Sequence, residues 1–80
     1  MKLPRDVSGR TLVAALGRFG YAVSRQTDSH VQLTTQAGGE HHITVPWHSP
    51  IRIGTLNTIL RQVAAHAGIT RDELLQRLEL

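Results

Sequence analysis

Residues 24–34 hold the side chains of this chain that are best suited to acid–base chemistry. The segment reads SRQTDSHVQLT, and its histidine, His30, directly follows the turn-forming residues Thr27-Asp28-Ser29. Val31 and Leu33 alternate with polar neighbours, which is the period of a half-buried strand. This alternation places His30 at the start of the strand, on the face away from Val31 and Leu33. There it could exchange a proton near neutral pH; the alternative is a surface histidine without a role.

The composition limits the class of protein. Eighty residues are enough for one domain, so residues 1–80 are expected to fold as a single unit. The absence of cysteine excludes disulfides and thiolate sites and favours a reducing cytoplasm. No segment approaches the roughly 20 apolar residues of a membrane span, so we expect no membrane association. Eight of the nine basic residues are arginines, which suit bidentate contacts to phosphate. Against six acidic residues, this excess alone does not establish a nucleic-acid partner.

The segment before residue 21 predicts a helix over residues 9–19. Ser8 is a good N-cap, and Gly20 suits the left-handed residue that ends a helix. The apolar positions between them recur at helical spacing: Leu12, Val13, Leu16 and Phe19.

Three strands are predicted next, near residues 21–26, 30–35 and 41–46. Short connections join them, including a hairpin with Gly38-Gly39, so they form an antiparallel meander with one apolar and one polar face. Four side chains of the outer strands are expected to face the core: Tyr21, Val23, Ile43 and Val45. His42 and Thr44 are expected on the polar face.

Two further helices are predicted after Pro46, which ends the third strand. The longer one spans about residues 55–67 and carries an apolar stripe of Leu56, Ile59, Leu60, Val63 and Ala67. Gly68 ends it, and Thr70 with Glu73 forms a capping box for a short last helix. The apolar residues of that helix are Leu74, Leu75 and Leu78. The predicted fold class is therefore α+β, in the order α-β-β-β-α with an extra C-terminal short helix, and with the helices on one face of a three-stranded antiparallel sheet.

This order of elements is that of the double-stranded-RNA-binding-domain fold, and four segments in it resemble the HicA family of mRNA interferase toxins. They are Arg25-Gln26-x-x-Ser29-His30, a glycine-containing hairpin, Ile43-Thr44-Val45-Pro46-x-His48, and Gly54-Thr55-Leu56-x-x-Ile59-Leu60-Arg61-Gln62. They occur in the family's order and nearly at its spacing, over about residues 8–69. The last helix resembles the C-terminal extension of some longer members.

The resemblance implies the toxin of a type II toxin–antitoxin pair, which cleaves mRNA and is neutralised by a HicB-type antitoxin. The family's essential histidine follows a serine at the start of the second strand, and that position is His30 here. One residue departs from the pattern: two positions before the histidine the family usually has glycine, and this chain has Asp28. A carboxylate there would either favour the imidazolium or repel phosphate.

The chemistry of RNA cleavage suits such a histidine. RNA supplies its own nucleophile, the 2′-hydroxyl, and a positioned histidine can accept its proton or protonate the departing 5′-oxygen. The full reaction calls for two such groups and a cation at the phosphate. We therefore predict His30 as the catalytic residue and expect neither a metal nor another cofactor. The residues expected to contact RNA are Arg25, Ser29, His42 and Arg52, of which His42 is a candidate for the second group.

Two main alternatives remain open, and a third fits the sequence less well. One is a catalytically inactive RNA-binding module of the same fold. The other is a metal-binding protein, since three of His30, His41, His42 and His48 could hold zinc; His41 and His42 are adjacent on a strand and point to opposite faces, so all four cannot converge. Residues 56–80 also fit a helix-turn-helix, although the stripe on the longer helix is needed to cover the sheet. Trp47 is expected to anchor its loop at the edge of the core.

Overall fold

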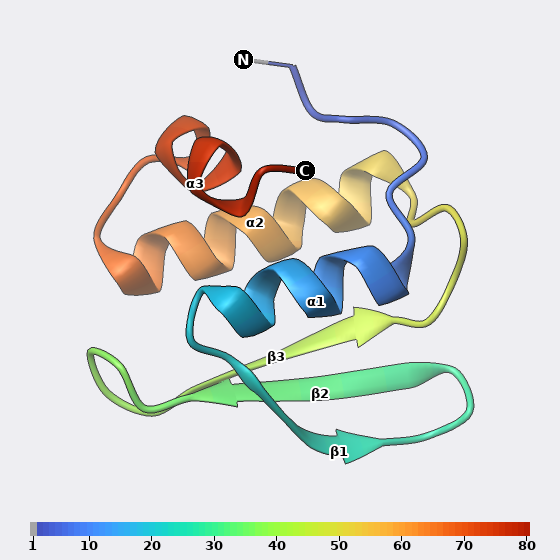
Figure 1. Cartoon of the computed structure of the whole chain (residues 1–80), viewed down its shortest axis with the longest axis horizontal. Helices are drawn as coiled ribbons and strands as arrows, with labels where there is room; N and C mark the ends of the chain where they lie inside the picture. Colours follow the sequence, from blue (N-terminus) through green and yellow to red (C-terminus); the bar gives the residue numbers. More distant parts are fainter. Residues whose placement is uncertain (1) are drawn as a thin grey trace.

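A computed structural model describes residues 2–80 as a sheet covered on one face by helices (Figure 1). The elements are α1 (Gly9–Arg18), β1 (Ala22–Gln26), β2 (His30–Thr35), β3 (His41–Pro46), α2 (Ile53–Ala67) and α3 (Arg71–Leu78). The three strands pair antiparallel in the order β1-β2-β3. α1 and α2 pack on the sheet, and α3 packs on α1 and α2. The predicted α+β fold, with its helices on one face, is confirmed.

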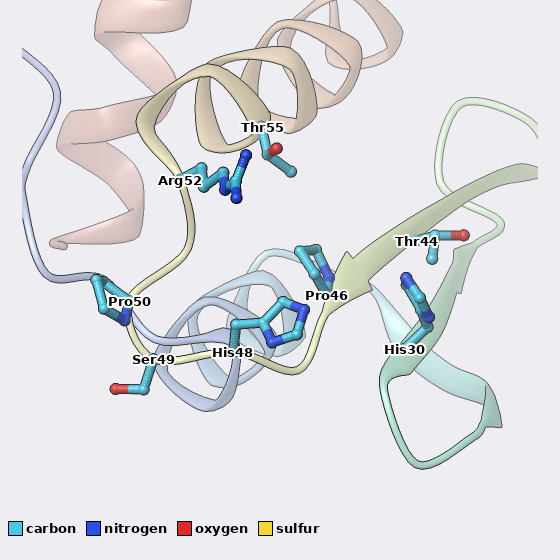
Figure 2. A pocket seen from close by; sticks show the side chains of 8 residues that line it. All are labelled: His30, Thr44, Pro46, His48, Ser49, Pro50, Arg52 and Thr55. Atoms are coloured by element: carbon cyan, nitrogen blue, oxygen red, sulfur yellow. The ribbon is translucent and has the colours of Figure 1, made fainter.

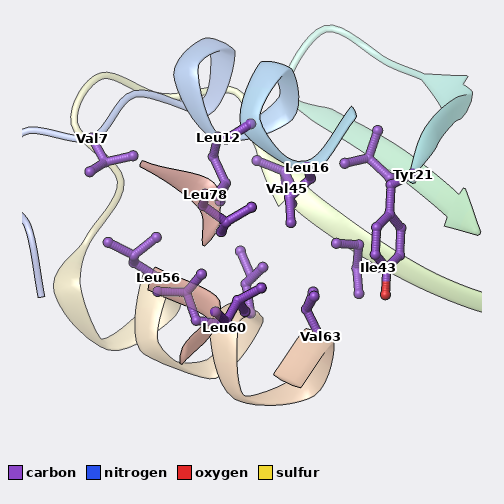
Figure 3. Packing of buried hydrophobic residues seen from close by; sticks show 14 of the residues in the cluster. Val7, Leu12, Leu16, Tyr21, Ile43, Val45, Leu56, Leu60, Val63 and Leu78 are labelled. Atoms are coloured by element: carbon purple, nitrogen blue, oxygen red, sulfur yellow. The ribbon is translucent and has the colours of Figure 1, made fainter. Parts of the chain in front are cut away.

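The core lies between the sheet and the helices. The largest fully buried side chains come from every helix and from β2 and β3: Leu12, Leu16, Leu33, Leu56, Leu60, Leu74, Leu78, Val31, Val45 and Val63. Figure 3 shows Leu78 of α3 in the same cluster as Leu12 and Leu16 of α1. Burial of one such leucine stabilises the fold by roughly 1.5–3 kcal/mol, so α3 is part of the core and not an appendage.

Ser8, Gly68 and Thr70 cap their helices as predicted. The Ser8 hydroxyl accepts a hydrogen bond from Thr11 N in the first turn of α1, and the Thr70 hydroxyl accepts one from Glu73 N in α3. Gly68 ends α2 with a φ of 73°. Within residues 2–80, no helix has both the length and the apolar character needed to cross a membrane.

The prediction for Val23 is wrong. Tyr21 is buried, but Val23 is 51% exposed. Val23 pairs with Leu33 and so shares its side of the sheet; however, β1 is the edge strand, and all of its residues are exposed because the helices do not cover it. A β-bulge at Ser24 follows, after which Arg25 pairs with Gln32. The bulge breaks the simple alternation and brings Arg25 to the open face of the sheet.

The predicted stripe of the long helix needs one correction. α2 begins at Ile53, two residues earlier than predicted, and its buried residues include Ala64 but not Ala67. Ala67 lies in the last turn, where it lines a surface hollow next to His66. The other four stripe positions are buried as predicted.

Candidate functional site

His30 is held by the turn that precedes it. Its amide donates to the Thr27 hydroxyl at 3.2 Å, and its carbonyl accepts from the Thr27 amide at 2.9 Å. The side chain is exposed on the open face of the sheet, whereas Val31 next to it is buried. Nδ1 of His30 lies 2.9 Å from the Ser29 hydroxyl, so Ser29, and not Asp28, orients the ring. For Nε2 we find no hydrogen-bond partner among residues 2–80, which leaves that nitrogen available to a substrate.

The loop after β3 is tied by three backbone hydrogen bonds to two other parts of the chain, the β1–β2 turn and the start of α1. The amide of Trp47 donates to Ser29 O at 2.8 Å, so the start of the loop is bonded to the residue before His30. The amide of Gly9 donates to His48 O at 2.8 Å, and the amide of Ile51 donates to the carbonyl of residue 7 at 2.7 Å. These bonds, with the buried Ile51 side chain, fix the backbone of the loop beside the β1–β2 turn.

A hollow of about 740 Å³ lies where these parts of the chain meet. It lies between the start of β2, the end of β3, the loop and the start of α2, and the residues that line it are His30, Thr44, Pro46, His48, Ser49, Pro50, Arg52 and Thr55. In Figure 2, His30 extends from the start of β2, His48 from the loop after β3, and Arg52 from the start of α2. None of the eight lining residues is acidic, so the hollow favours an anion.

The start of α2 adds to this positive character. Arg52 is its N-cap, no side chain caps the helix there, and its first turn carries no acidic residue. A helix N-terminus presents unpaired amides and the positive end of the helix dipole. Arg52 and Thr55 both line the hollow, so the guanidinium and the helix end act on the same space. Among residues 2–80 we find no hydrogen bond or ion pair from the Arg52 guanidinium.

A smaller hollow adjoins the first, on the open face of the sheet. It measures about 240 Å³, and the residues that line it are Arg25, Thr27, His30, Gln32 and Thr44. His30 and Thr44 therefore border both hollows. The structure thus brings Arg25, Ser29 and Arg52, three of the four residues predicted to contact RNA, to the surroundings of His30.

His42, the fourth, lies elsewhere on the open face. His30 pairs with Pro46, whereas His42 pairs with Thr34, four residues further along β2; this corresponds to roughly 13 Å at the rise of a strand. Nδ1 of His42 lies 2.7 Å from the Thr34 hydroxyl and Nε2 lies 2.8 Å from the Glu40 carboxylate. The hydrogen bond with His42 lowers the pKa of Glu40. Both ring nitrogens of His42 are therefore engaged with the protein.

His41 and His66 form a separate cluster at the other end of the sheet. Their rings stack with centroids 4.4 Å apart, and Nδ1 of His41 lies 2.8 Å from the Tyr21 hydroxyl. Burial, followed by the proximity of His66 and His42, lowers the pKa of His41, and burial raises that of Tyr21. Nε2 of His66 lies 2.9 Å from Ala37 O. The cluster therefore joins the β2–β3 hairpin to α2.

The positions of the histidines bear on the metal-binding alternative. Within residues 2–80, no group of three or more His, Cys, Asp or Glu side chains is placed to hold a metal ion. His41 is turned toward Tyr21 and His66, while His42 is engaged by Glu40 on the open face. The four histidines considered from the sequence thus do not form one ligand set.

His48 is the site residue that the sequence alone does not single out as functional. In the sequence it stands only as part of the Pro46-x-His48 segment and as a possible zinc ligand. A signal is nevertheless present: in an antiparallel pair, the strand that ends at Pro46 ends beside the start of the strand that begins at His30. Trp47, which precedes His48, is half-buried against the core as expected. The Arg10 guanidinium lies 5.4 Å from the centroid of the Trp47 ring.

Comparisons with known proteins identify the family. A family model described as the HicA toxin of bacterial toxin–antitoxin systems matches residues 9–64, which is more than half of the chain. Searches of curated proteins and of solved structures returned no match. The matched region contains both hollows around His30 and ends before α3. Members of this family are toxins with ribonuclease activity, and each is paired with an antitoxin. The chain belongs to the HicA toxin family.

Proposed function

We propose that this toxin is an endoribonuclease that cleaves mRNA without a metal ion, that His30 is its general acid or base, and that a HicB-type antitoxin neutralises it. One observation carries the proposal. The ring of His30 is oriented through Nδ1 by Ser29 and offers Nε2 in a hollow that Arg52 makes cationic. A histidine held beside a phosphate site is what cleavage of RNA through its own 2′-hydroxyl requires.

The reaction needs little beyond positioning and proton transfer. The 2′-oxygen attacks the adjacent phosphorus, the bond from phosphorus to the 5′-oxygen breaks, and the products are a 2′,3′-cyclic phosphate and a 5′-hydroxyl. His30 either removes the proton of the 2′-hydroxyl or protonates the 5′-oxygen, a contribution of about 10²- to 10⁴-fold. Arg52 and Arg25 bind the non-bridging oxygens and stabilise the charge that develops on them.

The test compares the wild-type protein with His30→Ala. We expect wild-type expression to arrest growth and the purified protein to cleave RNA in EDTA, leaving 2′,3′-cyclic phosphate ends. His30→Ala should lose about 10²- to 10⁴-fold in cleavage rate and be tolerated by cells. His66→Gln is the matched control, because it replaces a histidine outside the hollow and should cleave at the wild-type rate.

Three results would contradict the proposal, each in a different way. Full toxicity of His30→Ala, with its circular dichroism unchanged, would remove the central residue. Loss of cleavage in EDTA that zinc restores would mean that a metal takes part. RNA binding by the wild type with no cleavage of any RNA would favour the alternative, an inactive binding module of the same fold.

A further inference from the structure

We infer that His48 is the second acid–base group of the reaction, acting opposite His30 across the 740 Å³ hollow. The inference rests on the proposed function, because it assigns the partner that RNA cleavage requires. One histidine accepts the proton of the 2′-hydroxyl and the other donates a proton to the 5′-oxygen.

The argument begins with the groups that are present. Of the residues that line the hollow, only His30 and His48 can exchange a proton near neutral pH, since Arg52 stays charged and the others are Thr, Ser and Pro. His42, the candidate taken from the sequence, lines a different hollow and has both ring nitrogens bonded, to Thr34 and Glu40. His48 is therefore the partner that the geometry offers to His30.

The backbone that carries His48 is fixed relative to His30. The residue before His48 bonds to the residue before His30, through Trp47 N and Ser29 O, and the carbonyl of His48 itself accepts from Gly9 N. These bonds hold the two backbone segments in fixed relative positions, so both side chains start from defined points on the rim of the same hollow. Such positioning favours transfer of two protons at one phosphate. The loop needs no rearrangement to present His48.

The surroundings of His48 leave its ring available. The side chain is exposed, and we find no hydrogen-bond partner for either ring nitrogen among residues 2–80. His48 shares the large hollow with Arg52, and it shares a second hollow with Arg10, whose guanidinium lies over the Trp47 ring. The lining of that second hollow is Ser8, Arg10, Trp47, His48 and Ser49. The residues that line these two hollows include no carboxylate, so cations alone are the charged groups around the ring.

The proton balance closes with these two groups. One histidine starts neutral, and it gains the proton of the 2′-hydroxyl as the bond from oxygen to phosphorus forms. The other histidine starts protonated, and it loses its proton to the 5′-oxygen as the bond from phosphorus to that oxygen breaks. The enzyme has then exchanged the protonation states of His30 and His48, and exchange with water restores them.

The experiment uses an RNA oligonucleotide whose cleavage site has been mapped with the wild-type protein. His48→Ala and His48→Gln are compared with His30→Ala and with the control His66→Gln. We expect both His48 variants to lose about 10²- to 10⁴-fold in kcat while binding the 2′-deoxy analogue with an affinity within a few-fold of the wild type. The rate of the wild type should pass through a maximum with pH. Each variant at position 30 or 48 should lose one limb of that profile, and His66→Gln should keep both.

A modified substrate assigns the roles. Sulfur in place of the 5′-oxygen at the cleavage site leaves without protonation, so it should restore cleavage to the variant that lacks the general acid and not to the variant that lacks the general base. We expect rescue of either the His30 or the His48 variants, but not of both. Circular dichroism of each variant confirms that it is folded.

The outcomes separate this inference from the proposed function. If His48→Ala keeps the wild-type kcat while His30→Ala is inactive, the inference is wrong and the function stands. If His48→Ala raises only KM and keeps both limbs of the pH profile, His48 binds RNA and does not transfer a proton. If the wild type cleaves no RNA, or if His30→Ala is fully active, both are overturned.

Discussion

At the scale of single residues, Arg52 differs from the arginines that join helices. Arg18 donates to Leu78 O and Arg71 donates to Asn57 Oδ1, so these two hold helices together. Arg52 instead lines the hollow with His30 and His48. A guanidinium placed there can bind two phosphate oxygens at once, which the point charge of a lysine cannot do.

We therefore predict that Arg52→Ala weakens binding of an uncleavable 2′-deoxy oligonucleotide about 10- to 100-fold, the equivalent of one charged hydrogen bond at about 1.5–3 kcal/mol. The affinity of Arg52→Lys should fall between those of the wild type and Arg52→Ala. The dependence of log affinity on log salt should become shallower by about 0.7 for each phosphate that the variant no longer neutralises. Fluorescence anisotropy at several salt concentrations measures both quantities.

Arg61→Ala is the matched control for this prediction. Arg61 is exposed on α2, about 13 Å further along the helix axis at its usual rise, and it lines none of the hollows around His30. If Arg61→Ala weakens binding as much as Arg52→Ala, the effect comes from net charge and not from a phosphate site.

The residues of the site differ in how well the sequence can predict them. The face that His30 occupies is predictable because strict alternation in a strand fixes which face each side chain takes. Arg25 reaches the open face only through the bulge at Ser24, which breaks that alternation and has no pattern of its own. His48 lies in a loop, where no period applies, and its position depends on hydrogen bonds to Gly9 and, through Trp47, to Ser29.

At the scale of elements, the site depends on how closely α1 approaches the loop after β3. Gly9 begins α1 at the point where its amide bonds to His48 O. A Cβ added to Gly9 would clash with Pro46 O and lie 3.1 Å from the Trp47 Cα, and both of these are backbone atoms that cannot rotate away. The helix and the loop therefore meet backbone to backbone, and only glycine fits between them.

We predict that Gly9→Ala destabilises the protein by about 1–3 kcal/mol, the usual cost of overpacking. Gly17→Ala, in the same helix, should instead stabilise it by up to about 1 kcal/mol, since its Cβ would meet nothing within 4 Å and alanine favours helix. Urea unfolding gives both free energies. Gly9→Ala should also reduce RNA cleavage by the folded protein, because it displaces the loop that carries His48.

The opposite result would show that the contact at Gly9 is not decisive. If Gly9→Ala were as stable and as active as Gly17→Ala, the loop would have freedom that the hydrogen bonds do not suggest. The comparison holds helix propensity constant, because both changes replace glycine by alanine within α1.

The helices and strands themselves are predictable from the sequence, but which of their inward-facing residues become buried is not. Caps, apolar periods and glycines place all three helices and all three strands, because these signals are local. Whether a residue on the inner side is covered depends on where the helices lie over the sheet. Val23 of the edge strand and Ala67 of the last turn of α2 are exposed for this reason.

At the scale of the whole molecule, the two sides of the sheet have separate tasks. The helices cover one side and build the core, to which Leu74 and Leu78 of α3 contribute although the family match ends at residue 64. The other side is open and polar; the smaller hollow lies on it, and the larger one extends from His30 and Thr44 past the end of β3 to the start of α2. A net charge of +3 is compatible with the proposed RNA substrate and with an acidic partner surface.

This division suggests how an antitoxin acts. A surface that admits a single strand of RNA is open enough to be covered by another protein. Arg25 and Arg52 border the hollows and can pair with acidic residues of a partner, which speeds association. The helical side offers a less direct route, because a partner bound there would have to alter the site through a packed core.

We therefore predict that the antitoxin occludes the site by contacting His30 or its neighbours on the open face. Hydrogen exchange on the complex, formed with His30→Ala to avoid toxicity, should show added protection in residues 24–34. The amides of residues 28 and 29 are the most informative, since they lie in the turn and not within a strand, whereas the Thr27 amide is already bonded to His30 O. Residues 56–80 serve as the internal control and should exchange as in the free toxin. Protection confined to residues 56–80, with 24–34 unchanged, would mean that the antitoxin acts from the helical side and that occlusion is wrong.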